Sequence, residues 1–292
     1  MIMYRNSLII VFLLLSIHLH GQIEDYNVVW DTPSLNSGES MPCGGGDIGL
    51  NVWVENGDLL FYMARSGTFD ETNTLLKQGR IRIQLSPNPL EGTDFRQELR
   101  LQEGCVTISG KKAGIATDIR IWVDVFHPVI HIETSNNTPL QATVSYENWR
   151  YDDRLIQKNE SHQNSYKWAP PKGLQMKKDQ VHFDENRIVF YHRNEGETIF
   201  DATVHQQGMD SVKEQLFNPL KNLIFGGIIE AQGFRPAGIA TGKYSDTDFH
   251  AWQLESNKPL KNWKLTIRLH TAQTNNLADL LQVGKFDVVY ID

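Results

Sequence analysis

The chain of 292 residues contains very little cysteine. Cys43 and Cys105 are the only two, so the sequence has no cysteine cluster of the kind that holds a structural zinc ion. In an oxidising compartment two cysteines can form one disulfide, and otherwise they remain separate buried thiols. The sequence leaves both interpretations open, because spacing alone does not show whether the two side chains meet.

Clusters of positive charge are also missing. The chain has 28 Lys and Arg residues against 35 Asp and Glu residues, a formal net charge of −7, and the positive residues do not gather into a block. Binding to nucleic acid or to an anionic membrane depends on such a block, so we expect neither partner. The histidines show no H-E-x-x-H or comparable spacing, and a hydrogen bond between strands explains His131 and His192. We therefore expect no metal site and no cofactor.

The apolar run near the N-terminus is shorter than the roughly twenty residues that a membrane-spanning helix requires. It extends from Leu8 to Ile17, follows Arg5, and gives way to polar residues before Gly21. A positive start, a short apolar run and a polar end are typical of a signal peptide. We therefore predict a signal peptide over residues 1–21, export to the periplasm or the extracellular space, and no permanent membrane anchor.

Segments with helical periodicity are nearly absent, and only Asn276 to Leu281 is briefly typical of a helix. Short segments with alternating apolar and polar residues recur instead, as at Ile81, Ile83 and Leu85. This pattern predicts an all-β fold, a large β-sandwich in one domain over residues 22–285, with a turn at residues 136–139. Further strands are expected at residues 97–102, 106–109, 119–125, 129–134, 141–146, 181–183, 187–192, 223–230 and 263–270.

One hairpin is specified locally. Asn56-Gly57 lies between the apolar segments Ile48 to Val54 and Leu59 to Met63. Asn-Gly is the pair that most readily adopts positive φ at both central positions of a type I′ turn. We predict a two-residue β-hairpin here. By contrast, residues 151–178 break the strand pattern and are expected to form a long loop over the sandwich, with or without a functional role.

Three elements in the N-terminal part carry a resemblance to a known family. They are Trp30 to Ser34, then Met41 to Gly49 with its run of three glycines, and then Arg65 to Glu71. Together they resemble the N-terminal β-sandwich family catalogued as domain of unknown function five-seven-zero-three. They resemble more distantly the N-terminal domain of the fucosidases of glycoside hydrolase family ninety-five. In those fucosidases a P-x-G-N-G-x-x-G opening precedes a hairpin and an N-E-D-T-x-W loop. Pro42 to Gly49 matches the opening, whereas Arg65 to Glu71 replaces the loop with different residues.

The resemblance implies an architecture larger than this chain. It implies a supersandwich of two large antiparallel sheets followed by a helical (α/α)6 barrel that carries the catalytic carboxylates. We expect the C-terminal catalytic (α/α)6 barrel to be absent and residues 286–292 to be the truncated start of a linker. No catalytic residue is therefore assigned to this chain.

The resemblance also supplies candidate contact residues. In the related fucosidases the glycine-rich turn and the loop after the hairpin approach the active-site face of the barrel. Asp47, Arg65, Asp70 and Glu71 are therefore candidate contacts to the sugar or to the barrel. The local sequence of Asp70 and Glu71 favours a solvated turn, and two adjacent carboxylates on one loop do not flank a glycosidic bond.

Aromatic residues give a second set of candidates. Indole rings pack on the flat C–H faces of sugars, while polar neighbours bond the hydroxyl groups. Trp149 and Arg150 supply both kinds of group, and Trp168 adds a second platform. The other tryptophans in strand patterns, such as Trp122, are expected to pack in the core or on sheet surfaces.

Two functional hypotheses from different classes result. The first is a non-catalytic N-terminal β-sandwich module of a glycoside-hydrolase-like, fucosidase-like carbohydrate-processing protein, which supports a catalytic barrel and its substrate cleft. The second is a free-standing secreted carbohydrate-binding protein. The expected partner is thus a carbohydrate or a helical barrel domain. An enzyme acting alone would need two carboxyl groups about 5 Å or roughly 6.5 to 9.5 Å apart.

Overall fold

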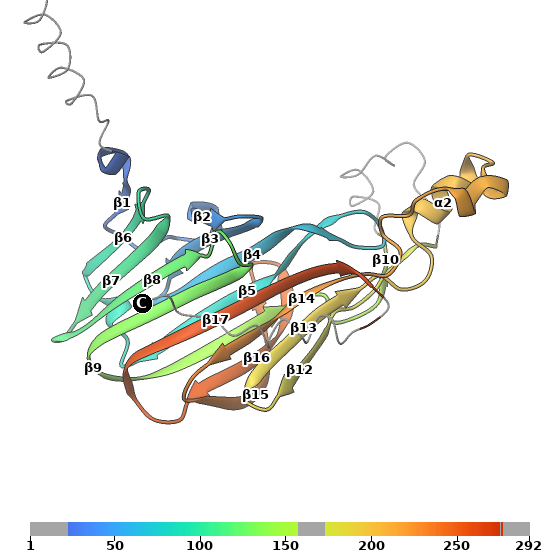
Figure 1. Cartoon of the computed structure of the whole chain (residues 1–292). Helices are drawn as coiled ribbons and strands as arrows, with labels where there is room; N and C mark the ends of the chain where they lie inside the picture. The colour runs from blue at the N-terminus through green and yellow to red at the C-terminus, as the bar shows by residue number, and fades with distance from the viewer. Residues whose placement is uncertain (1–22, 157–172, 275, 277–292) are drawn as a thin grey trace, which may run out of the picture.

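The computed structural model describes residues 23–156, 173–274 and 276, and these form two antiparallel β-layers that pack face to face (Figure 1). Layer A has the strand order β1-β6-β7-β8-β9-β17-β14-β13-β12, and layer B has the order β2-β3-β4-β5-β9-β16-β15. The predicted all-β supersandwich of two packed sheets is confirmed, and no helical barrel is present among the described residues. The predicted signal peptide and linker lie outside the described residues.

The strand bounds are as follows. Layer A contains β1 (Val28–Trp30), β6 (Asp94–Arg100), β7 (Cys105–Lys112), β8 (Ile115–Val123), β12 (Gln180–Asp184), β13 (Arg187–Arg193), β14 (Leu223–Ala231) and β17 (Leu260–Gln273). Layer B contains β2 (Met41–Gly45), β3 (Ile48–Glu55), β4 (Asp58–Phe69), β5 (Leu75–Ser86), β15 (Phe234–Tyr244) and β16 (Thr247–Ser256). A separate short pair consists of β10 (Arg154–Leu155) and β11 (Gln175–Met176).

Strand β9 (Val129–Asn148) belongs to both layers. Its first half pairs with β8 and β17, and its second half pairs with β5 and β16. The predicted turn at residues 136–139 is therefore wrong, because these residues lie inside the strand where it passes from one layer to the other. Asn136 stabilises this passage, since its side chain accepts a hydrogen bond from Thr117 Oγ1 at 2.6 Å and donates one to the Leu260 carbonyl at 3.2 Å.

The predicted Asn-Gly hairpin is confirmed. β3 and β4 pair in register from Glu55 opposite Asp58, and the two turn residues have φ values of 52° and 81°. Positive φ at both positions is what a type I′ turn requires. Behind the hairpin, alternate residues of both layers face inward and form the main core, and a smaller apolar cluster that includes Ile199 and Phe225 is separate from it. Phe61, Ile81, Tyr146 and Phe190 are among the largest fully or almost fully buried side chains.

Helical segments lie between the strands of the described residues, and the α-helix among them was not predicted. α2 (Ile199–Gln206) follows Thr198, whose backbone N–H donates to the Asp201 carboxylate at 2.9 Å. The Thr-x-x-Asp spacing is a helix-start signal that was present in the sequence. Of the predicted helix at 276–281, only Asn276 is described. Within the described residues the 3₁₀ segments are η1 (Ile23–Tyr26), η2 (Ser37–Glu39), η3 (Pro89–Glu91) and η5 (Asp210–Gln215).

Candidate functional site

Glu71 organises the end of the sandwich that lies near α2. It follows β4, and its side chain is completely buried. Its carboxylate accepts backbone hydrogen bonds from Lys177 at 3.3 Å and Glu195 at 3.4 Å, and its carbonyl oxygen accepts one from Ile199 at 2.8 Å. The expectation of a solvated Glu71 is wrong, because backbone N–H groups from distant segments replace water around it. Glu71 thereby fixes the chain before β12, after β13 and at the start of α2.

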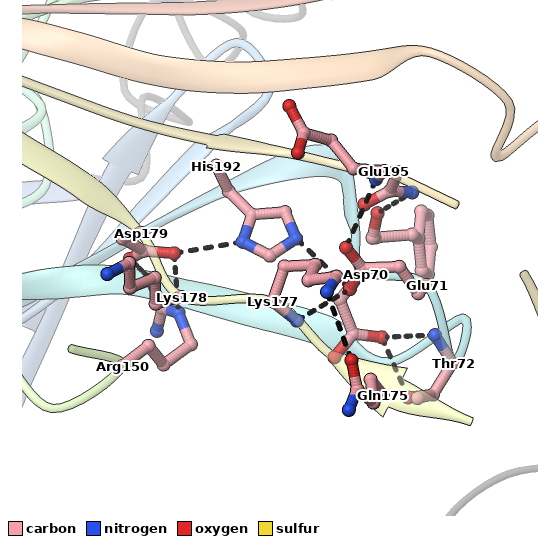
Figure 2. A network of polar contacts seen from close by, with 12 residues as sticks. Asp70, Glu71, Thr72, Arg150, Gln175, Lys177, Lys178, Asp179, His192 and Glu195 are labelled. Atoms are coloured by element: carbon pink, nitrogen blue, oxygen red, sulfur yellow. Dashed lines mark hydrogen bonds and ion pairs between the residues drawn. The ribbon is translucent and has the colours of Figure 1, made fainter. Parts of the chain in front are cut away.

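His192 lies between two carboxylates. Its Nδ1 is 2.9 Å from Asp179 Oδ1, and its Nε2 is 3.3 Å from Glu71 Oε2 (Figure 2). Its ring stacks on Phe225 with centroids 5.0 Å apart. Burial by itself disfavours the charged ring, but hydrogen bonds and the charges of Asp179 and Glu71 outweigh it and raise the pKa of His192 to about 9. The ring is therefore an imidazolium at neutral pH.

Asp179 completes the network with Arg150. Arg150 donates from Nε to Asp179 Oδ1 at 3.1 Å and from Nη2 to Oδ2 at 2.5 Å, and Asn148 Nδ2 donates to Oδ2 at 2.6 Å. Burial would raise the pKa of Asp179, but the charge of Arg150 and the hydrogen bond and charge of His192 hold it below its ordinary value. Arg150 thus makes a bidentate pair, the strongest geometry that a guanidinium offers.

Asp70 is next to this network but has a different environment. Thr72 and Thr74 donate backbone hydrogen bonds to its Oδ1, each at 2.9 Å, and the Thr72 hydroxyl adds a third at 2.7 Å. Among the described residues its buried Oδ2 has no hydrogen-bond donor. Burial raises the pKa of Asp70 above its ordinary value. The expectation of a solvated Asp70 is therefore also wrong, since the side chain is only 1% exposed.

The four central side chains form a closed set of charges (Figure 2). Two carboxylates, Glu71 and Asp179, face two cations, His192 and Arg150, and each charged group has its partner inside the set. Side-chain exposure is 9% for Arg150 and at most 3% for the others. Such a set holds segments in place, because its charged groups pair with one another inside the protein and not with solvent.

Glu71 and Arg150 were among the candidates predicted from the sequence, whereas Asp179 was not. His192 was explained by a hydrogen bond between strands. The structure gives His192 such a partner, since Asp179 directly precedes β12, the neighbour of β13. A further signal was available. His192 has the same parity along its strand as the core residues Ile188 and Phe190, and a polar residue on a core face requires a buried partner.

A second group of candidates lies around the β2–β3 turn. Arg65 Nε donates to Asp47 Oδ2 at 2.8 Å, and its Nη1 donates to the Leu269 carbonyl at 2.8 Å. The glycine run packs on the β8–β9 connection, because a Cβ at Gly45 would meet Val125 Cγ1 at 3.2 Å. Beside this contact Val125 is 62% exposed and Phe126 is 88% exposed. We call Asp47, Arg65, Val125 and Phe126 the tip surface.

The third group of candidates consists of Trp149, Arg150 and Trp168. Trp149 is half-buried, and its ring meets Tyr62 edge-on with centroids 6.0 Å apart. Arg150, its expected partner in sugar binding, lies with its guanidinium 5.6 Å from the Trp149 ring and directs its donors to Asp179 and the Lys77 carbonyl. Trp168 lies outside the described residues.

Both cysteines are free thiols in the structure. Cys43 packs against the core, where its Sγ lies 4.0 Å from the Ile121 carbonyl oxygen. Cys105 has the opposite parity to the core residue Val106, and its Sγ lies 3.8 Å from Glu103 on the outer side of layer A. Burial is the main cause that raises the pKa of Cys43 to about 11, and the neighbouring Cys105 adds to it. This thiol is therefore protonated at neutral pH.

Two other kinds of site are absent from the described part of the chain. No group of three or more His, Cys, Asp or Glu residues within it is arranged to hold a metal ion. None of its helices has the length and apolar character needed to cross a membrane.

The fold and the buried charge set define a class, a two-layer β-sandwich domain whose loops at one end are fixed by internal ion pairs. The chain belongs to the family described as Domain of unknown function (DUF5703), whose sequence model matches residues 29–284. No curated protein matches the chain. Among solved structures it is similar to a putative kojibiose phosphorylase from human microbiome, with 10% sequence identity and a TM-score of 0.37. That similarity covers 90% of this chain and 36% of the phosphorylase.

Proposed function

We propose that the chain is a non-catalytic β-sandwich module of a glycoside-hydrolase-like carbohydrate-processing protein, and that its tip surface supports a helical barrel domain. The observation that carries the proposal is Phe126, an aromatic residue of the tip surface that is 88% exposed. Family membership and the resemblance of the glycine-rich opening to fucosidase N-terminal domains support the identity of the partner.

The turn that presents Phe126 is held rigidly. The Asp124 carboxylate accepts backbone hydrogen bonds from Phe126 at 2.8 Å and His127 at 3.1 Å, and the His127 ring lies 3.0 Å from the same carboxylate. A preorganised aromatic side chain loses little conformational entropy on association and is typical of the residues that dominate interface energies. The paired Asp47 and Arg65 follow or adjoin the glycine run that packs on Val125, and they supply the polar rim that such an interface requires.

The burial and pairing of the carboxylates favour a structural role for this domain over a catalytic one. A glycosidase acid must reach the leaving oxygen, and its nucleophile or base must reach the sugar or a water molecule. Glu71 and Asp179 are at most 3% exposed and are engaged by His192 and Arg150. Their role in the proposal is to hold loops, and the proposal assigns hydrolysis to the barrel.

The test begins with the genomic DNA beyond the codon for Asp292, which is read in every frame for a sequence that encodes a helical barrel. That barrel is expressed separately, and its binding to the full chain is measured by calorimetry. Phe126→Ser is expected to weaken binding by about 2 kcal/mol or more, as truncation of a central aromatic anchor does. The matched control is Phe217→Ser, because Phe217 is 75% exposed but follows η5, in the helical region.

Two results would overturn the proposal. One is the absence of any barrel-coding sequence, which leaves the free-standing carbohydrate-binding protein as the function. The other is a barrel that binds the wild type and Phe126→Ser equally well. Both variants change exposed residues, so equal unfolding midpoints will show that any loss of binding is not a loss of folding.

A further inference from the structure

The outer face of layer A carries a groove that is separate from the tip surface. Five neighbouring strands, β6, β7, β8, β9 and β17, form its floor, and its volume is about 1050 Å³. A second hollow of about 520 Å³ adjoins it and shares Glu133, Gln232 and Lys264 with it. Together we call them the layer A groove. The larger hollow alone is at the upper end of the range for sites that hold one small molecule, so the size fits an extended ligand.

The register of the sheet aligns polar side chains in rows across this floor. One row is Arg96, Ser109, Asp118, Ser135 and Asn262, and the other is Glu98, Thr107, Arg120, Glu133 and Lys264. All ten residues are at least partly exposed. Adjacent strands are about 4.8 Å apart, so each row offers a polar group at every step along a line of roughly 19 Å.

The charges of the groove compensate one another. Arg96 pairs with Glu98 at 3.2 Å, Lys264 pairs with Glu133 at 2.6 Å, and Arg120 lies 3.7 Å from Glu103. A groove for an anionic polymer would instead leave its cations unpaired, as in nucleic-acid-binding proteins. Alternating donors and acceptors suit hydroxyl groups, each of which donates one hydrogen bond and accepts others.

An aromatic side chain completes the lining. Trp122 is half-buried in the adjoining hollow and is held by stacking on His131, with ring centroids 4.9 Å apart and an angle of 15° between the planes. A fixed indole beside rows of polar side chains matches the apolar faces and the polar hydroxyl groups that a sugar presents. From the sequence Trp122 was expected to pack in the core or on a sheet surface, and it does stack on His131 of the neighbouring strand β9. Its place in a groove was not predicted.

We propose that the layer A groove binds a neutral oligosaccharide, with its hydroxyl groups on the two polar rows and a sugar ring beside Trp122. This site does not depend on a barrel partner. It makes the chain a carbohydrate-binding module in its own right, whether or not the tip surface supports another domain.

Binding of neutral oligosaccharides, from disaccharides to hexasaccharides, to the full chain is measured by calorimetry. Affinity is expected to rise with ligand length and to change little with salt. Asp118→Ala and Trp122→Ala are each expected to weaken binding about tenfold, which corresponds to about 1.4 kcal/mol. Trp149→Ala, which removes the aromatic ring that meets Tyr62 of layer B, is the control and is expected to leave affinity unchanged.

The proposal is overturned if no neutral oligosaccharide binds the wild type, if the groove variants bind normally, or if Trp149→Ala is the variant that loses binding. Preference for an acidic oligosaccharide with steep salt dependence would also overturn it. Asp118 is exposed, so its variant will fold and will report on binding even if Trp122→Ala is unstable. Phe126→Ser leaves this groove intact, so failure of barrel docking and failure of oligosaccharide binding are distinguishable.

Discussion

At the residue scale, His192 shows how ionisation and folding are linked in this protein. The ring is 2% exposed and has carboxylates on both sides, so its proton is retained to a higher pH than in the unfolded chain. A raised folded-state pKa stabilises the fold at pH values below the ordinary His pKa of about 6.5. This contribution is lost as the pH rises through about 9, the folded-state pKa.

We therefore predict that the free energy of unfolding falls by about 3 kcal/mol between neutral pH and pH values above the pKa of His192. Urea unfolding at a series of pH values measures it. In His192→Gln this alkaline decline is expected to be smaller, and the variant is expected to lose about 3 kcal/mol or more at neutral pH, because two buried carboxylates lose a counter-charge.

His205→Gln is the matched control, because the His205 side chain is 79% exposed and pairs with Asp210 at the surface. It is expected to change stability by less than about 0.5 kcal/mol and to keep the alkaline decline. An equally steep decline in His192→Gln would show that another group is responsible.

At the element scale, strand β14, which pairs with β17 on one side and β13 on the other, depends on glycine. A Cβ at Gly226 would lie 2.1 Å from the Phe190 carbonyl oxygen and 2.5 Å from the Tyr191 Cα, both backbone atoms of β13. Because backbone atoms of a paired strand cannot move aside singly, a side chain here would separate β13 from β14. His192 is on β13, so the buried charge set depends on this close approach.

Gly226→Ala is thus predicted to destabilise the protein by about 3 kcal/mol, at the upper end of the usual cost of overpacking. Gly49→Ala is the control, since Gly49 is also in a strand but a Cβ there has nothing within 4 Å. Thermal unfolding of both variants tests the difference. Equal midpoints for the two would mean that β13 and β14 accommodate the methyl group.

At the scale of the whole molecule, β9 makes the two layers one structural unit. Ile132 lies in its layer A half and Val144 in its layer B half, and both are completely buried in the same core. A strand that supplies hydrogen bonds to both layers cannot remain paired in one while the other unfolds around it. The layers are therefore expected to unfold together.

Accordingly, Ile132→Ala and Val144→Ala are each predicted to lower the midpoint of one common unfolding transition, with a loss of about 2 to 5 kcal/mol for the isoleucine. Calorimetry, together with near- and far-UV circular dichroism, measures whether the probes coincide. Two resolved transitions, of which each variant moves a different one, would contradict this prediction.

The sequence by itself determined the all-β class, most strand positions and the Asn56-Gly57 hairpin, because alternation of apolar residues and turn chemistry act over a few neighbouring positions. Only the tertiary structure decided that residues 136–139 continue a strand and that Glu71 is buried. It also brought Glu71 and Asp179 to opposite sides of His192, from segments separated by more than a hundred positions. Such contacts follow from strand register and layer packing, which local patterns do not encode, and the layer A groove arises in the same way from five aligned strands.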